Sequence, residues 1–178
     1  MINLFKTTVV NEGYIQVGLA YFIGYRKNLI VPNVSYGWLN YEADLLTVSQ
    51  SGWLTEIEIK TSLQDLKHDL KKGHGHNDKR VRKLVYCIPE ACLEWAVQNL
   101  PAQDGIIIWK VKAAKQGNQE INILSFSNFR QAKARKDVKQ LTDKEIISLQ
   151  RLGCMRIWSL KLHNLYSKQY GNRKAIPA

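Results

Sequence analysis

Cysteine is scarce in this chain, and its few cysteines are not arranged to bind a metal or to cross-link a small domain. Cys87, Cys92 and Cys154 are scattered and form no Cys-x-x-Cys pair. Neither a zinc knuckle nor a disulfide framework is therefore indicated. Because Cys87 and Cys154 lie in apolar segments, we expect both to be small core residues.

Long apolar runs are absent as well. The first residues, MINLFKTTVVNEG, do not place a basic region before an apolar run of signal-peptide length. No stretch approaches the roughly 18 uninterrupted apolar residues of a membrane-spanning helix. The sequence also has no internal repeat and no low-complexity linker. We expect a cytoplasmic protein that does not enter a membrane.

Acidic residues are sparse in the second part of the chain. Residues 1–60 contain 4 Lys/Arg and 5 Asp/Glu (net −1), and residues 61–178 contain 22 and 10 (net +12), which together give the formal charge of +11. A polyanion is the natural partner of such a surface, and nucleic acid is the commonest one. The alternative is a basic protein that is merely soluble.

The 178 residues, 45% of them apolar, are enough for one domain with a sizeable core. Apolar periodicity and capping signals predict a helix over 12–25 capped by Asn11, a short extended segment at 29–34 in which Pro32 indicates an edge or turn, and a hairpin of strands at 42–49 and 53–60. A helix capped by Ser62, with a stripe of Leu63, Leu66 and Leu70, is expected to end at Gly73. A strand at 84–88, a helix at 90–99, strands at 105–111 and 121–126 joined by a Gly-Asn turn, and a long helix started by the Thr142 capping box follow. Gly153 is expected to kink or divide that last helix. The order predicts an α/β fold, a mixed central sheet flanked by helices, in a single domain of residues 1–170 with a flexible tail at 171–178.

The candidate catalytic and metal-binding residues centre on Glu58-Ile59-Lys60. Other acidic-x-Lys triplets occur, but only this one lies in a predicted strand, where residues two apart share a face. Glu56 lies on the same face. Three charged residues in register are costly to bury unless they are paired or bind a metal. The alternative is a hairpin with one solvated face, on which these are ordinary surface residues.

Asp44 opens the preceding strand, and a hairpin brings it beside Glu58. Two carboxylates with a strand carbonyl, that of Ile59, suit Mg²⁺ or Mn²⁺. Such an ion polarises a phosphodiester oxygen and lowers the pKa of a water. Lys60 could orient or deprotonate that water, or neutralise the charge that develops on the phosphate. Service as a base would require a lowered lysine pKa.

The order of these features resembles the PD-(D/E)xK nuclease superfamily over about Glu12 to Pro89. Within it, EIEIKTSLQDLKHDLK followed by KLVYCIP resembles the branch of MmcB-type DNA-repair proteins. The resemblance implies a restriction-endonuclease-like fold, with Asp44 and Glu58 as metal ligands and Lys60 as the catalytic lysine.

The chain departs from the family pattern at one position and leaves a second position open to more than one residue. The proline that often precedes the first aspartate is replaced by Ala43. Many members place a glutamate on the first helix, and Glu12 is the accessory candidate, although an acidic residue there also fits a simple helix-dipole partner. Glu42 and Glu56 are alternative accessory carboxylates.

Two basic clusters are candidate contacts to a nucleic-acid backbone, with solvated loops as the alternative. The first consists of Lys71, Lys72, Lys79, Arg80, Arg82 and Lys83, and the second of Arg130, Lys133, Arg135, Lys136 and Lys139.

The remaining candidate ligands and stacking groups are weaker. His74 and His76 with Asp78 offer a set of transition-metal ligands, but a flexible polar loop is the favoured interpretation of this segment. The five tryptophans are expected mostly in the core, and base stacking by Trp38 is the less favoured alternative to packing.

These patterns predict a Mg²⁺-dependent deoxyribonuclease, a hydrolase of DNA repair or nucleic-acid processing. A catalytically inactive DNA-binding accessory protein with the same fold is the alternative, and RNA is an alternative substrate. A single site makes one nick, so double-strand cleavage would require a homodimer. A protein partner is also possible, but the sequence does not indicate which protein it would be.

Overall fold

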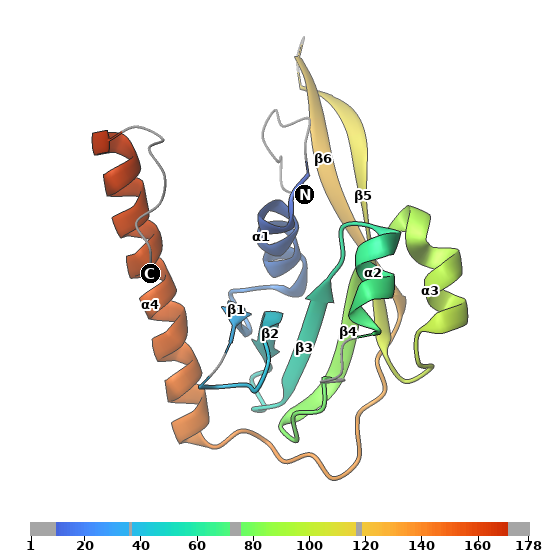
Figure 1. Ribbon diagram of the computed structural model, residues 1–178, viewed down its shortest axis with the longest axis vertical. Helices are drawn as coiled ribbons and strands as arrows, with labels where there is room; N and C mark the ends of the chain where they lie inside the picture. Colours follow the sequence, from blue (N-terminus) through green and yellow to red (C-terminus); the bar gives the residue numbers. More distant parts are fainter. Residues whose placement is uncertain (1–9, 36, 72–75, 117–118, 171–178) are drawn as a thin grey trace.

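One six-stranded sheet, whose strands lie side by side in the order of the chain, organises the molecule (Figure 1). This computed structural model describes residues 10–35, 37–71, 76–116 and 119–170. The predicted fold class is confirmed: the chain forms an α/β domain with a mixed sheet and helices packed on it. The elements are α1 (Glu12–Ile23), β1 (Leu29–Val34), β2 (Ala43–Val48), β3 (Leu54–Ile59), α2 (Leu63–Asp69), β4 (Val81–Pro89), the 3₁₀ turn η1 (Glu90–Cys92), α3 (Leu93–Asn99), β5 (Gly105–Gln116), β6 (Gln119–Arg130) and α4 (Asp143–Tyr170).

The sheet is mixed because the chain uses both antiparallel connections and crossovers. β1, β2 and β3 pair antiparallel, as do β5 and β6. β4 is parallel to both β3 and β5. Parallel neighbours need a crossover connection, and α2 and α3 provide the two crossovers. The predicted edge position of the segment at 29–34 is confirmed, because β1 is the first strand of the sheet.

Helix α1 covers one face of the sheet (Figure 1). Asn11 caps it by accepting a hydrogen bond from the backbone N–H of Tyr14, and Gly24, at φ 89°, ends it. Ile15 and Leu19 are fully buried in a cluster with Ile57 and other residues of the sheet. This packing places the N-terminal part of α1 near the start of β2, where Gln16 donates to the carbonyl of Asp44.

The other face of the sheet carries two apolar clusters. One joins β1, β2 and the segment before β2 to α4, with Leu46 and Leu149 among its buried members. The second joins β4 and β5 to α2 and α3, with Leu66 and Leu84 among its members. The polar side of β3 lies on this face, between the two clusters. A strand in that position has little water around it, which explains the burial described below.

Helix α4 begins as predicted and continues further than expected. Thr142 and Glu145 form the capping box, with the Thr142 N–H donating to Glu145 Oε2 over 2.8 Å. The predicted kink or division at Gly153 is wrong, because one helix runs from Asp143 to Tyr170. Gly153 lies beside β1, where an added Cβ would meet a methyl group of Val31 at an ordinary contact distance of 3.6 Å.

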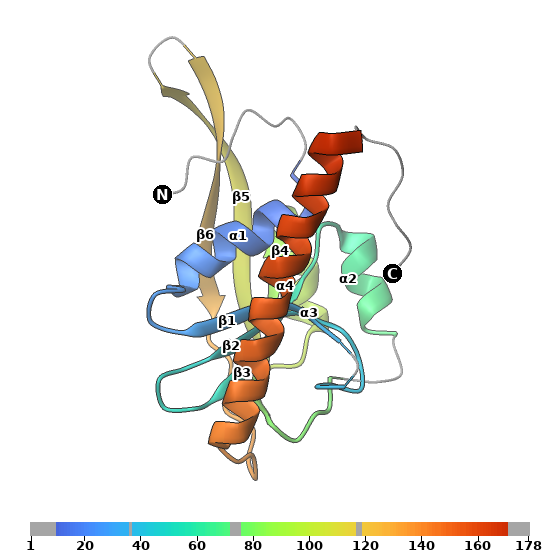
Figure 2. The ribbon, with the colours of Figure 1, turned by 90° about the vertical axis from the view of Figure 1, so that its left-hand side faces the viewer.

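Two core predictions fail on the same helix. Cys154 is exposed, whereas Cys87 and Cys92 are buried. Trp158 is 68% exposed, although Trp38 packs in the core as expected. Both errors arise because little of α4 packs on the domain. The helix runs along the outside of the molecule (Figure 2), Cys154 lies on its exposed side, and every residue from Ile157 to Leu165 is exposed.

Several predicted features fall outside the described residues. These are Gly73, Lys72 and His74, the Gly-Asn turn at 117–118 and the tail at 171–178. Within the part of the chain that the structure describes, no helix combines the length and apolar character that crossing a bilayer requires.

Candidate functional site

Strand β3 buries a row of charged side chains. Glu56, Glu58 and Lys60 lie on one side of the strand, and none is more than 3% exposed. The alternative that they are surface residues of a solvated hairpin is therefore wrong. Buried charges persist only when they are paired or ligated, so their partners define the site.

Lys60 lies at the centre of the carboxylates. Its Nζ is 2.8 Å from Glu58 Oε2, 3.0 Å from Asp69 Oδ1 and 3.8 Å from Asp44 Oδ2. Burial alone would lower the pKa of Lys60, but the charge and hydrogen bond of Glu58, together with the other carboxylates, outweigh burial and raise it. Lys60 is therefore an ammonium at neutral pH in the metal-free protein.

Asp44 comes from the neighbouring strand, as the predicted hairpin requires. The antiparallel pairing of Leu45 with Ile57 brings Asp44 to the end of β3, where its Oδ2 accepts a hydrogen bond from the Ile59 N–H over 2.7 Å. The Asp44 side chain is 21% exposed, so this end of the cluster opens to solvent. The predicted trio of Asp44, Glu58 and Lys60 is brought together in space.

Glu12 and Gln16 on α1 extend the solvent-exposed end of the cluster. Gln16 Nε2 donates to Glu12 Oε1 over 3.0 Å and to the Asp44 carbonyl over 3.3 Å. Burial and the charge of Asp44 raise the pKa of Glu12. The accessory position predicted for Glu12 is therefore beside Asp44, whereas Glu42 is exposed and Glu56 is buried deeper in the sheet.

His76 completes the buried side of the cluster. Its Nδ1 lies 2.6 Å from Glu56 Oε1 and its Nε2 lies 3.2 Å from Asp69 Oδ2. Tyr41 donates its hydroxyl to Glu56 Oε2 over 2.6 Å. These contacts run continuously from the segment before β2, through β3, to α2 and the segment that follows it.

Sequence reasoning missed three members of this network. His76 was expected in a flexible polar loop, yet it is only 4% exposed. The apolar stripe of α2 was expected to include Leu70, but Leu70 is 39% exposed and Asp69 is buried instead. Tyr41 carried no signal in the sequence. For Asp69 a signal existed: it follows Leu66 by three residues, so a carboxylate lies on the buried side of a helix.

Burial and charge shift the protonation of the network. Burial, followed by the charge of Asp44, raises the pKa of Glu58 to about 7. Burial would lower the pKa of His76, but its bonds to Asp69 and Glu56 and the charge of Glu58 raise it to about 10. Four carboxylates (Asp44, Glu56, Glu58 and Asp69) thus share two cations, and the cluster keeps an excess of negative charge.

The cluster contains a group of side chains that could hold a metal ion. Glu56, Glu58 and His76 are all buried, and one ligand atom from each lies within 4.8 Å of the others. Glu58 Oε1 is buried and has no hydrogen-bond partner among the described residues. A buried oxygen of this kind is costly to leave without a partner, so it marks a position suited to a cation.

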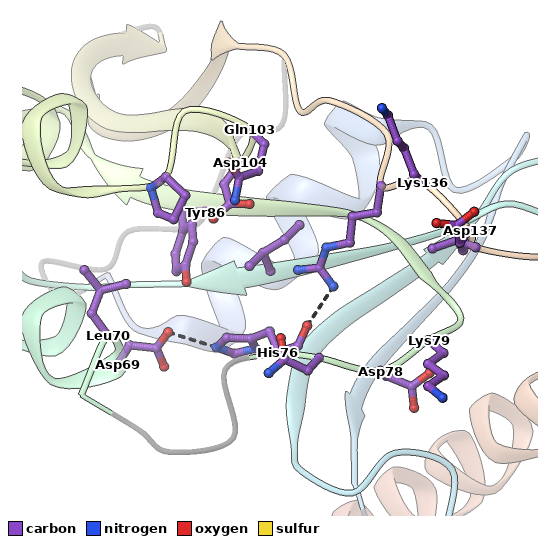
Figure 3. Close-up of a pocket in the computed structure, with 15 residues that line it drawn as sticks. Asp69, Leu70, His76, Asp78, Lys79, Tyr86, Gln103, Asp104, Lys136 and Asp137 are labelled. Carbon is purple, nitrogen blue, oxygen red and sulfur yellow. Dashed lines mark hydrogen bonds and ion pairs between the residues drawn. The ribbon is translucent and has the colours of Figure 1, made fainter.

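A cavity of about 660 Å³ lies beside the buried end of the cluster (Figure 3). Asp69 and His76 form part of its wall, and Tyr86 and Asp104 line the side toward β4 and β5. Burial raises the pKa of Asp104. Lys79 and Lys136 also line this cavity, so the two basic clusters predicted separately meet around one opening.

Several basic residues predicted to contact nucleic acid are held by the protein itself. Arg80 binds Asp78 and the carbonyl of Trp38, and its guanidinium stacks over the Trp38 ring. Arg82 lies over the Trp53 ring at 3.7 Å. The remaining members of the first cluster are exposed or half-buried: Lys71, Lys79 and Lys83.

The second cluster is divided in the same way between bonded arginines and exposed lysines. Arg135 donates to the His76 carbonyl over 2.8 Å, and Arg130 donates to the carbonyls of Asp104 and Pro101. Lys133, Lys136 and Lys139 are exposed.

Comparison with known proteins provides a match of fold. No family model matches the sequence, and no curated protein matches it. Among solved structures, the chain is similar to the SPO1766 protein of unknown function from Silicibacter pomeroyi, with a TM-score of 0.57 and 16% sequence identity, over 97% of this chain and 100% of that one. At this identity the similarity shows the fold alone.

Proposed function

We propose that the protein is a metal-dependent nuclease of the PD-(D/E)xK kind that hydrolyses DNA phosphodiester bonds. One observation carries the proposal: Asp44, Glu58 and Lys60, from two adjacent strands, meet in a single cluster at the end of β3. The Asp44 side of this cluster is open to solvent, so a phosphate could reach it. The net positive charge of the chain suits a polyanionic substrate.

The donor atoms fit a hard divalent cation. Asp44 and Glu58 would hold Mg²⁺ or Mn²⁺ with the carbonyl oxygen of Ile59, and Glu12 would assist from α1. The excess of carboxylates over cations supports this assignment, because a further positive charge would neutralise it. The bound ion would supply the charge that polarises a phosphodiester oxygen.

Lys60 then serves as a fixed positive charge. Three carboxylates surround its ammonium and raise its pKa, so it does not give up its proton readily. Of the three roles open to it, neutralising the charge that develops on the phosphate is therefore favoured over acting as a base. Asp69 would position the ammonium from α2.

The exposed lysines would bind the DNA backbone. Lys71, Lys79 and Lys136 are free to contact phosphates without reading sequence, and Lys72 stays a candidate by its position in the sequence. The arginines that bind Trp38, Trp53 or the His76 carbonyl would instead stabilise the fold. The proposal includes DNA as the substrate and a role in repair.

The deciding experiment is cleavage of labelled single-stranded, duplex, flapped and junction DNAs, with matched RNAs, in Mg²⁺ or Mn²⁺. Asp44→Asn and Glu58→Gln keep the side-chain shape and remove a ligand charge, so each should lower the rate at least about 100-fold. Glu94→Gln, an exposed carboxylate on α3, is the matched control and should cleave normally. Circular dichroism would verify that every variant is folded.

The other outcomes separate the alternatives. Full metal-dependent cleavage by both site variants would refute the assignment. Salt-sensitive DNA binding with no cleavage in either metal would identify the inactive accessory protein. Faster cleavage of RNA than of DNA would keep the site and change the substrate.

A further inference from the structure

Glu56, Glu58 and His76 direct three ligand-type atoms toward one buried point. His76 Nδ1 is 2.6 Å from Glu56 Oε1 and 3.8 Å from Glu58 Oε1. Glu58 meets His76 through Oε1 and Lys60, which also contacts Asp44, through Oε2. The carboxylate of Glu58 thus separates two positions for a cation.

Neighbouring groups bind the second carboxylate oxygen of Glu56 and of Glu58 and the second ring nitrogen of His76. Tyr41 donates to Glu56 Oε2, and Lys60 donates to Glu58 Oε2. His76 Nε2 lies 3.2 Å from a carboxylate oxygen of Asp69. Metal-binding histidines commonly donate their second ring N–H to a carboxylate, which fixes the ring and strengthens the ligand nitrogen. The outer contacts that such a site needs are therefore already formed.

Glu58 Oε1 provides the independent sign of a ligand. It is buried in a side chain that is only 2% exposed, and it has no hydrogen-bond partner within the described residues. Because an unsatisfied buried carboxylate oxygen is costly, a cation at this point would remove an existing cost.

The donor atoms indicate the class of ion. Mg²⁺ and Ca²⁺ prefer sites made of oxygen alone, whereas an imidazole nitrogen favours zinc and its first-row neighbours. We propose that Glu56 Oε1, Glu58 Oε1 and His76 Nδ1 form a second cation site, distinct from the Asp44–Glu58 position, that binds a first-row transition-metal dication of the Zn²⁺ class. The site goes beyond the proposed nuclease function and does not depend on it.

Binding of Zn²⁺ to the full-length, chelator-stripped protein tests the site directly. Equilibrium dialysis with elemental analysis should find one tightly held zinc per chain. His76→Gln and Glu56→Gln should each weaken zinc binding at least about 10-fold, the smallest loss expected even from an outer contact. Asp44→Asn is the matched control: it alters the Mg²⁺ position and none of the three zinc ligands, so it should change zinc affinity far less than the ligand variants do.

Two further measurements keep the test sound if a ligand variant fails to fold. Tyr41→Phe removes only the hydroxyl that holds Glu56, so it should fold and weaken zinc binding about 10- to 100-fold. Co²⁺, used as a coloured substitute, should give a visible absorption spectrum in the wild type that changes in His76→Gln but not in Asp44→Asn.

The results that overturn the site are equally specific. Failure of the wild type to retain zinc, or equal losses in the His76 and Asp44 variants, would refute it. Unchanged NMR signals of the His76 ring on addition of zinc would show that this ring serves only as a protonated partner of Glu56 and Asp69. The two proposals can fail separately. If the wild type cleaves DNA with Mg²⁺ in the absence of zinc and Asp44→Asn does not, the proposed nuclease function stands even when the second site fails.

Discussion

Lys60 is a single buried ammonium that is shared by several carboxylates. Replacing it with methionine would remove the ammonium that Glu58 Oε2 and Asp69 Oδ1 contact, at positions no more than 3% exposed, and would leave His76 as the remaining cation of the network. Breaking a buried pair in this way costs about 3–5 kcal/mol. We expect Lys60→Met to lower the free energy of unfolding by that amount in urea denaturation.

Lys110 provides the matched control for this substitution. It also pairs with a glutamate, Glu90, but its side chain is 38% exposed and that of Glu90 is 55% exposed. Exposed pairs contribute about 0–1 kcal/mol, so Lys110→Met should change stability little. Equal losses in the two variants would contradict the view that the Lys60 network is a buried ionic cluster.

The protonation of His76 gives the metal-free protein a characteristic pH dependence. The pKa of His76 is raised in the folded state from 6.5 to about 10, so its contribution to stability is complete below pH 6.5 and is lost as the pH rises through about 10. Glu58, raised from 4.5 to about 7, acts in the same direction at lower pH. Unfolding free energy should therefore fall between pH 6.5 and 10.

Urea denaturation of wild type and His76→Gln across this range, in the presence of a chelator, checks the effect. The wild-type curve should slope downward, and the variant curve should be flatter above pH 7. Equal slopes for the two proteins would show that His76 is not protonated in the folded state.

The residue scale also shows what the sequence could and could not predict. The alternation along β3 placed Glu56, Glu58 and Lys60 on one side, because strand geometry is local. Whether that side was dry depended on the elements that cover it, among them α3 and α4, which lie far away in the sequence. His76 is buried by contacts with β3 and α2, and no local pattern around it distinguishes such a residue from one in a polar loop.

Among the elements, α1 depends on a close approach that only glycine permits. A Cβ at Gly18 would lie 2.7 Å from a ring carbon of Phe126 on β6. Over-packing of this kind costs about 1–3 kcal/mol. Gly18→Ala should therefore destabilise the protein, whereas Gly13→Ala on the same helix, where the nearest atom would be 3.5 Å away, should not.

Thermal unfolding of both glycine variants measures this difference. The Gly18 variant should also shift α1 and with it Glu12, so metal affinity at the Asp44 end of the cluster offers a second measurement. An equal melting temperature for the Gly18 and Gly13 variants would mean that Phe126 moves aside without cost.

Element boundaries were predictable wherever a cap determines them. Asn11 and Thr142 begin their helices as expected, because the capping side chain and the backbone that it binds are only three residues apart. Strands β5 and β6 were predicted too short, since each extends to 12 residues. Their length comes from pairing with each other over polar positions, which apolar periodicity does not detect.

At the scale of the whole molecule, the outer side of α4 exposes several large apolar side chains. Ile147, Trp158 and Leu165 are each more than half exposed. With Cys154 they form a stripe with spacings of seven, four and seven residues, a pattern that is the same in both directions along the helix. Two copies packed antiparallel would therefore match these residues around a two-fold axis.

We expect the protein to form a homodimer through α4, an arrangement that would also supply two sites for double-strand cleavage. Trp158→Glu should shift the sedimentation equilibrium to the monomer. Val97→Glu places the same charge on an exposed apolar position of α3 and should leave the dimer unchanged. A wild-type protein that is monomeric at high concentration would refute this expectation.

The strand order has a consequence for how the protein is made. Neighbouring strands of the sheet are also neighbours in the chain, so each new strand can join the edge of the existing sheet as it leaves the ribosome. Every residue of the carboxylate cluster precedes position 77, but the apolar clusters that flank it include residues of β4, β5 and α4, which are made later. Synthesis therefore delivers the charges first and completes their dry surroundings only when α4 has been made.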